Sequence, residues 1–506
     1  MLQNAQCFKI RSASKHAADL VRLLSRTLAS TRQHHSHYDL PSSELSGRSS
    51  SVTVNVSPSH LTTPSWYFLR STLVMLSLAC CATPMAFSDD FSADEIRRNR
   101  PTSVQYTIRI EGKISTPNPQ GTQSFPITST GEFQFRNDQT NVEISGVNDL
   151  RAARKFHKAE TRTIVDKSRE TVVNLPSTYG LIHTCGHSGQ LRSWHPEYAL
   201  LRSQADLLRM PFDVLVMQTL IPTSTVKKTD RWNSSAWVVP ALTGLDATVT
   251  QSVTCSLKEL TDAEAEVEFE GSIEGAVTGS ASRVNFGGGL TFDRQTGIIR
   301  QATITMKEKR TAGPVSPGID ITATIQWSQD PVITTDPNVK IEEPTNQQLL
   351  LSTKAPGGLR FRHSRQWHLF HETESVMMLR LLKNGQLIGQ ANFSKGTTVK
   401  PGEHTSDAEF DQDIGASVSE RKGRVLQSQT VPVQKGWRFR QVQATGAAAK
   451  KTILWDYFLC SADSGQQFSV VFSHASEDAA DFEAEPLKLL QNFTLPKRRR
   501  PALPFR

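Results

Sequence analysis

Residues 265–273, AEVEFEGSI, carry apolar side chains at alternate positions. Val267, Phe269 and Ile273 fall on one side of an extended chain, and the glutamates between them fall on the other. This period of two is typical of a β-strand with one buried and one solvated face. Similar segments, separated by short turns, occur at residues 247–257, 282–292, 298–307 and 319–327. We therefore predict an antiparallel meander of five strands.

The chain on the N-terminal side of this meander continues the pattern. Alternating apolar residues at 104–110 and strand-like stretches near 133–144, 155–166 and 170–175 predict further strands. One helical passage, residues 196–220, interrupts them, and Pro211 divides it because proline breaks the helical hydrogen-bond ladder. A meander with a helical hairpin outlines a curved sheet, or half-barrel, closed by helices. We assign residues 89–329 to this half-barrel-like domain, whose outline resembles the periplasmic lipoprotein-carrier type of fold.

A second domain is predicted at residues 346–495. Residues 330–345 are rich in proline and acidic side chains and predict an extended linker. Beyond it, strand signals recur, and Asn384-Gly385 favours a hairpin turn. Apolar residues at 410, 414 and 418 predict a helix over residues 405–421, and a closing helix is expected from Ser476. The expected fold class is α+β, with two domains that are each a largely antiparallel β-sheet flanked by a few helices.

Several segments of the second domain carry a family resemblance. They are GQLIGQAN (385–392), KPGE (400–403), GWRFRQV (436–442), ILWDYFL (453–459), QFSVVF (467–472) and LQNF (490–493). In order and spacing, this domain resembles the PsbP-like fold, an antiparallel sheet flanked by helices. The resemblance implies a binding or scaffolding role, and it brings no shared active-site residues.

The segment WYFLRSTLVMLSLACCATPMAFS, residues 66–88, predicts the compartment. Basic Arg70, an apolar core and a small-x-small site ending at Ser88 follow one another as in a secretory signal peptide. The core is shorter than the roughly 20 residues that span a bilayer. We predict cleavage after Ser88 and a secreted or periplasmic protein, with residues 1–65 as a disordered or mis-annotated extension. The alternatives are a retained membrane anchor at 66–88, or lipidation at Cys80 or Cys81.

The net charge of +8 is concentrated at the two ends of the chain. Residues 1–88 and the basic tail KRRRPALPFR are positive, so the segment between them is close to neutral. A nucleic-acid-binding domain needs a basic face of its own, so nucleic acid is not an expected partner. The tail, residues 496–506, is interpreted as a solvated end, with contact to an anionic lipid or another polyanion as the alternative.

One short stretch has the residue types of a metal site. His183, Cys185 and His187 stand two positions apart, so a strand would turn them to one side as ligands for zinc or copper. The alternative is a polar loop with one buried cysteine. In an oxidising compartment Cys185 and Cys255 could form a disulfide, and buried free thiols are the alternative. No cofactor and no catalytic residues are predicted, because no nucleophile motif or acid–base grouping stands out.

Three functions remain open from the sequence. The first is an exported, non-enzymatic cell-envelope protein that binds or scaffolds an unidentified partner. The second is a carrier of a lipid, a lipoprotein or another hydrophobic ligand in the concavity of the first domain. The third is a metal-binding protein or metal-dependent enzyme that uses His183, Cys185 and His187.

Overall fold

The structure is a computed structural model that describes residues 90–96, 100–118, 121–139, 144–333, 341–448 and 450–495. The N-terminal extension, the segment at 66–88 with the cleavage site after Ser88, and the basic tail lie outside the described residues. Within those ranges, every helix is too short or too polar to cross a membrane.

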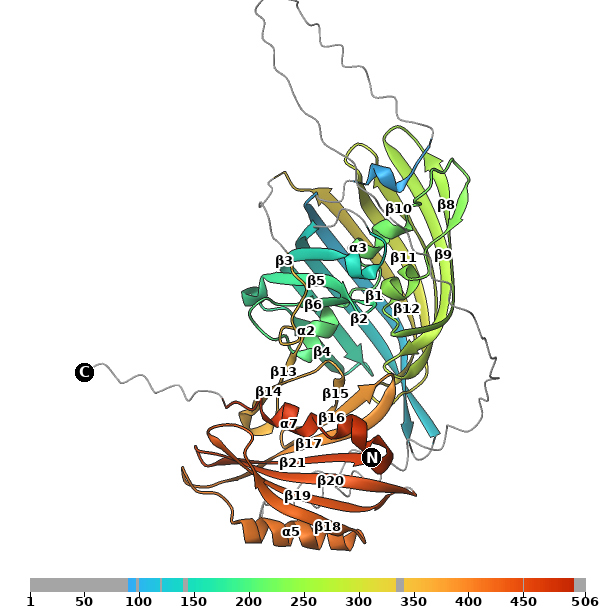
Figure 1. The fold of residues 1–506 in the computed structure, drawn as a ribbon. Helices are drawn as coiled ribbons and strands as arrows, with labels where there is room; N and C mark the ends of the chain where they lie inside the picture. The colour runs from blue at the N-terminus through green and yellow to red at the C-terminus, as the bar shows by residue number, and fades with distance from the viewer. Residues whose placement is uncertain are drawn as a thin grey trace, which may run out of the picture. The chain divides into compact units, whose positions relative to one another are not determined.

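The first half of the chain forms a sheet of twelve strands in which all pairs are antiparallel (Figure 1). Its path runs β6-β5-β3-β2-β1-β12-β11-β10-β9-β8-β7, and β4 pairs with β3. The strands are β1 (Thr102–Asn118), β2 (Gly121–Gln139), β3 (Arg151–Val165), β4 (Arg169–Asn174), β5 (Leu181–His187), β6 (Gln190–Trp194), β7 (Arg231–Asn233), β8 (Ala247–Leu260), β9 (Glu264–Val277), β10 (Ser280–Asp293), β11 (Ile298–Arg310) and β12 (Gly318–Pro331).

The predicted five-strand meander is confirmed as β8 to β12. The alternation of apolar and charged residues along β9 determines which side chains face the core. Val267 and Phe269 are buried, while the glutamates between them are exposed. The first strand of the sheet then pairs with the last, with Tyr106 opposite Trp327 and Ile108 opposite Ile325. This long-range pairing joins the N-terminal strands to the meander in one continuous sheet.

Short helices pack against the inner face of this sheet, and Figure 1 shows the strands curving around them. They are α2 (Arg202–Leu207), α3 (Val214–Met217) and α4 (Val238–Thr243). The predicted division of the helical passage at Pro211 is confirmed, because α2 and α3 lie on either side of it. Phe212, which has no exposed surface, stacks on Phe269 and meets Phe286 edge to face, so the insert is anchored in the core.

The beginning of the described chain is also anchored in this core. Phe91 is fully buried, forms an isolated bridge with Val226, and its ring lies 5.2 Å from that of Phe292. The buried guanidinium of Arg294 donates to both carboxylate oxygens of Glu95, at 2.8 and 3.2 Å. Only a 3-10 helix, Ala93–Glu95, occurs within the described part of the short helix-like stretch before Pro101.

The second half of the chain forms a seven-stranded antiparallel sheet in the order β15-β16-β17-β21-β20-β19-β18, and a separate two-stranded sheet pairs β13 with β14. The bounds are β13 (Leu351–Lys354), β14 (Arg360–His363), β15 (Trp367–Glu372), β16 (Val376–Lys383), β17 (Gln386–Thr398), β18 (Arg424–Val431), β19 (Trp437–Ala448), β20 (Lys451–Ala462) and β21 (Gln466–Ala475), with helices α5 (Asp407–Glu420), α6 (Ala479–Phe482) and α7 (Glu485–Leu490). The two larger sheets fall on either side of the predicted linker, of which residues 334–340 lie outside the described residues.

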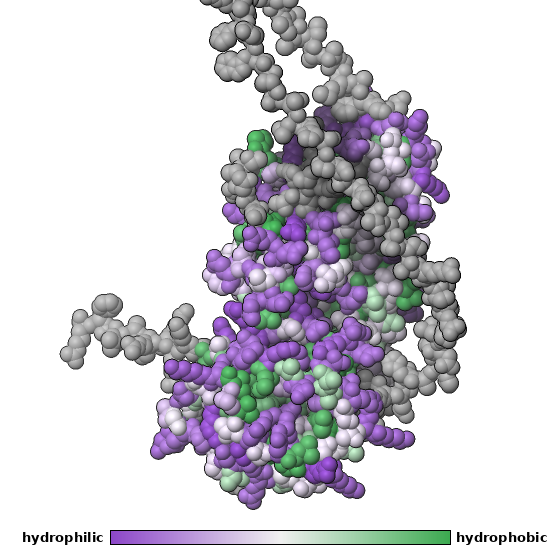
Figure 2. Space-filling view, viewed as in Figure 1, coloured by the Kyte–Doolittle hydropathy of each residue, from purple (hydrophilic) through white to green (hydrophobic). Residues whose placement is uncertain are grey.

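Both faces of the seven-stranded sheet are covered. Ile414 and Val418 of α5 pack with Tyr457 on one face, while Phe482 of α6 and Leu489 of α7 belong to the core cluster on the other. Hydrophobic residues also reach the surface of this body beside α7 and β15 (Figure 2), and they include Leu369, Phe370 and Leu487. The expected class of largely antiparallel sheets is therefore correct, although the helical share is small and, in the described residues, every α-helix except α5 is short.

Candidate functional site

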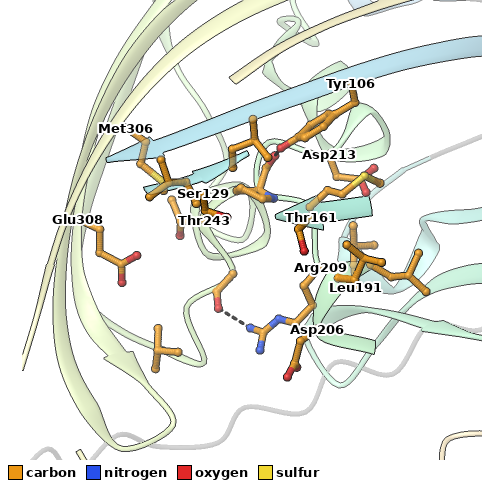
Figure 3. A pocket seen from close by; sticks show the side chains of 18 of the residues that line it. Tyr106, Ser129, Thr161, Leu191, Asp206, Arg209, Asp213, Thr243, Met306 and Glu308 are labelled. Carbon is orange, nitrogen blue, oxygen red and sulfur yellow. Dashed lines mark hydrogen bonds between the residues drawn. The ribbon is translucent and has the colours of Figure 1, made fainter. Parts of the chain in front are cut away.

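A cavity of about 560 Å³ lies between the inner face of the twelve-stranded sheet and the helical insert. Its sheet side is formed mainly by β1, β2, β11 and β12, and its other side by α2, α4 and the loop between α2 and α3. Figure 3 shows Glu308 and Met306 on one side of this cavity, with Thr161 and Leu191 across from them. The cavity lies entirely within the first half of the chain.

The sheet side of the cavity is largely apolar. Ile108 and Ile110 of β1 lie opposite Ile325 and Ala323 of β12, so they share one face of the paired strands with Ile319 and Ile321. The four isoleucines that line the cavity are only half-buried, whereas Ile325 on the same face is fully buried under the helices. The apolar face therefore extends beyond the part that the insert covers. Across the cavity the insert contributes further apolar groups, namely Leu207, Leu208, Met210, Pro211, Pro240 and Ala241.

One end of the cavity is closed by a fixed aromatic pair. Tyr106 is 1% exposed, its hydroxyl donates to the carbonyl of Pro211 at 2.7 Å, and its ring meets Phe133 edge to face at 5.5 Å. Burial, and secondarily the charge of Asp213, raise the pKa of Tyr106 well above its ordinary value. The phenol therefore stays protonated and holds the loop of Pro211 on the sheet.

Every charged residue in the lining has a partner of opposite charge. Asp206 accepts from Arg202 at 2.9 Å, and Arg209 lies 3.6 Å from Asp246. The other pairs are Asp213 with Arg154 and Glu308 with Arg310, each with a closest distance of 2.5 Å. The lining is thus balanced in charge and offers no unpaired ion to a charged ligand.

The predicted metal ligands lie on β5, as expected for residues two apart on a strand, but the structure does not bring them together as a site. No group of three or more His, Cys, Asp and Glu side chains in the described ranges could hold a metal ion. Cys185 is 1% exposed in a small cluster with Ala153 and Trp194, and the ring of His183 also packs on Trp194 at 5.5 Å. Packing against the tryptophan accounts for both residues without a metal.

The neighbouring His195 has a structural contact instead. Its Nδ1 accepts the backbone N–H groups of Glu197 and Tyr198, at 3.0 and 3.1 Å. Burial lowers the pKa of His195, so the ring is neutral and serves as an acceptor that closes this turn.

The predicted bridge between Cys185 and Cys255 is not formed in this structure, in which both thiols are free and buried. The two residues are far apart in the strand order, on β5 and β8. Cys185 belongs to the cluster with Trp194, whereas Cys255 belongs to the main core. The alternative of buried thiols is the one that the geometry favours.

We expect Cys185 and Cys255 to resist iodoacetamide at pH 8 in the folded protein. Burial raises the pKa of Cys185 to about 11 and that of Cys255 to about 12. Only the thiolate reacts, and at most about one thiol in a thousand is ionised at that pH. Peptide mass spectrometry should find both residues alkylated only after unfolding in urea. Protection that persists in urea until a reductant is added would instead reveal a disulfide.

Comparisons with known proteins leave the family open. No family model and no curated protein matches the chain. Among solved structures, "Lipid-protein interactions in lipovitellin" is similar with a TM-score of 0.29 and 8% identity over 48% of this chain, which spans 27% of that chain. OccK5 of Pseudomonas aeruginosa gives a TM-score of 0.11 at 7% identity, covering 74% of this chain and 98% of that one. The translocator domain of autotransporter NalP from Neisseria meningitidis gives 0.12 at 9%, covering 76% and 91%.

Such low TM-scores carry no argument about function. They also give no support to the PsbP-like resemblance of residues 346–495, which therefore stays a prediction. The candidate site is accordingly argued from the geometry of the cavity alone.

Proposed function

We propose that this protein is an exported, non-enzymatic carrier that holds the hydrocarbon part of a lipid, a lipoprotein or another hydrophobic ligand under its curved sheet. The observation that carries the proposal is the cavity between the apolar inner face of the sheet and the helical insert. Its volume of about 560 Å³ falls within the range of about 300–1,000 Å³ typical of small-molecule sites. Export is the part of the proposal that rests on residues 66–88.

The half-buried isoleucines favour a ligand-binding role for the cavity. Apolar surface that stays in contact with water is unfavourable, at about 25 cal/mol per Å². Ile108, Ile110, Ile319 and Ile321 keep part of their surface exposed in the cavity, and an apolar ligand would remove that surface from water. The cavity thus favours the carrier over a scaffold that binds only through its outer surface.

The simplest test measures binding of Nile red, followed by its displacement with lipids extracted from the source cells. We expect Ile110→Glu to weaken Nile red binding by about ten- to a hundredfold, because a carboxylate without hydrogen-bond partners is unfavourable on the apolar sheet side of the cavity. Ile110 lines the cavity, is half-buried, and lies opposite Ala323 in the sheet.

Val249→Glu is the matched control, since Val249 is 80% exposed on β8 and the chemical change is the same. The control variant should bind like the unmodified protein, and circular dichroism should confirm that both variants are folded. Equal binding by the two variants would place the dye outside the cavity and contradict the proposal.

A further inference from the structure

The inner face of β11 changes character along its length. Ala302, Ile304 and Met306 are apolar and buried, whereas the next inward position is Glu308, which is 7% exposed. In the sheet Glu308 lies between Val284 of β10 and Ile321 of β12. A carboxylate is thus placed between two apolar neighbours at the wall of the cavity, where Figure 3 shows it reaching inward.

All the hydrogen bonds that Glu308 accepts from described residues go to one of its two carboxylate oxygens. Ser282 Oγ donates to Oε1 at 2.8 Å, and Arg310 donates to the same oxygen through Nε at 2.9 Å and Nη2 at 2.5 Å. No described residue makes a hydrogen bond to Glu308 Oε2 or to Arg310 Nη1. The pair therefore has one acceptor and one donor that no described residue uses and that solvent can reach, in a side-chain pair that lines the cavity.

Fold stability does not account for this arrangement. Desolvating two charges offsets most of their attraction, so replacing a buried ion pair by apolar residues of similar size is often neutral or stabilising. An apolar side chain at this position would contact Val284 and Ile321 on the two neighbouring strands. Polar groups that cost stability at a binding cavity are instead typical of residues that orient a ligand.

We propose that Glu308 and Arg310 form the headgroup site of the carried ligand, and that this headgroup is uncharged. The inference rests on the proposed carrier function and extends it to a class of ligand: a hydrocarbon chain that ends in a hydroxyl or amide group. Such a group donates to Glu308 Oε2 and accepts from Arg310 Nη1. A charged headgroup would have no counter-ion, because the two residues already neutralise each other and the other charged residues of the lining are paired.

The test is displacement of Nile red by three compounds that share one acyl chain, namely monoolein, methyl oleate and oleate. Monoolein has hydroxyl groups, methyl oleate has no donor, and oleate is charged. We expect the unmodified protein to bind monoolein about tenfold more tightly than methyl oleate, the size of one hydrogen bond to a charged group. In Glu308→Leu/Arg310→Met the preference should vanish while methyl oleate still binds.

The matched control is Glu274→Leu/Arg283→Met, because this ion pair joins β9 and β10 while both of its side chains are largely exposed. It should keep the preference for monoolein. If the cavity variant does not fold, Glu308→Gln alone should reduce the preference.

The outcomes separate the two proposals. Binding of all three compounds with an unchanged preference in the cavity variant would overturn the headgroup site alone. A preference for oleate in the unmodified protein would overturn the uncharged headgroup. Failure of every compound and of Nile red to bind would overturn the carrier function itself, and the headgroup site with it.

Discussion

Replacing Arg154 by methionine is expected to lower the free energy of unfolding by about 3–5 kcal/mol, because it leaves a buried carboxylate without its counter-ion. Arg154 and Asp213 are 1% and 3% exposed at their side chains, and two hydrogen bonds of 2.8 and 2.5 Å join them. Arg154 also donates to Asn137 at 3.1 Å, while Asp213 caps α3 by accepting from the backbone of Leu215. Urea denaturation followed by circular dichroism measures the loss.

Two further variants distinguish an unpaired charge from a general packing defect. Arg154→Met/Asp213→Leu removes both charges, so it should be more stable than the single variant even though it loses the cap of α3. Arg109→Met breaks an ion pair with Glu111 whose side chains are 73% and 55% exposed, and it should cost at most about 1 kcal/mol. If the double variant were less stable than Arg154→Met, the loss of stability would not come from the unpaired carboxylate of Asp213, and our reasoning would be wrong.

The same pair connects stability with the cavity. It links β3 to the residue that begins α3, and Tyr106 holds Pro211 two residues earlier in the same loop. Both contacts fix the insert over the inner face of the sheet. Loss of the pair should therefore weaken Nile red binding in Arg154→Met under conditions in which the protein is still folded.

The strands of the meander were predictable because their signal is local. In β9 the alternation of Val267 and Phe269 with glutamates is complete within one strand, and the observed burial follows it. Pro211 likewise acts on its own neighbours, so the division between α2 and α3 could be located. Helix α4 was missed because Pro240 lies within its six residues and the segment has no clear period.

The candidate site was not predictable, because it depends on pairing between distant parts of the chain. The apolar side of the cavity exists only where β1 pairs with β12, which places Ile110 opposite Ala323 and Ile108 opposite Ile325. Glu308 shows the difficulty most clearly. It belongs to the charged run KEKR at 307–310, and the alternation of Ala302, Ile304 and Met306 places it on their side of the strand. The register of β11 between β10 and β12 decides that its neighbours are Val284 and Ile321, and the sequence alone does not show this register.

The metal hypothesis, which stays a prediction, shows the limit of a local pattern. The spacing of His183, Cys185 and His187 was interpreted correctly as strand-like, since all three lie on β5. The sequence could not show that Trp194 of the neighbouring strand lies opposite His183 in the ladder and packs on its ring. A repeated pattern of ligand-type residues therefore predicts a shared side of the strand, but not what covers that side.

Phe91→Ala is the second change for which we expect a large effect, a loss of about 3–5 kcal/mol in the free energy of unfolding. Phe91 has no exposed surface, packs on Phe292, and exchanges backbone hydrogen bonds of 2.9 Å with Val226 in both directions. Alanine would leave a cavity beneath the end of β10. Phe370→Ala is the control, since Phe370 is 39% exposed and its main contact is a cation–π interaction with Arg380, worth about 1 kcal/mol.

This prediction also bears on the proposed cleavage after Ser88. A chain that starts at Asp89 retains Phe91 and Glu95, the two residues that fasten the N-terminal segment to Phe292 and Arg294. A chain that starts at residue 97 loses both, so it should be at least as unstable as Phe91→Ala. Intact mass of the natively expressed protein shows where the chain starts, and thermal unfolding of the two shortened forms measures the effect on stability. If the form beginning at residue 97 were as stable as the form beginning at Asp89, the anchor would contribute nothing and the predicted cost of Phe91→Ala would be wrong.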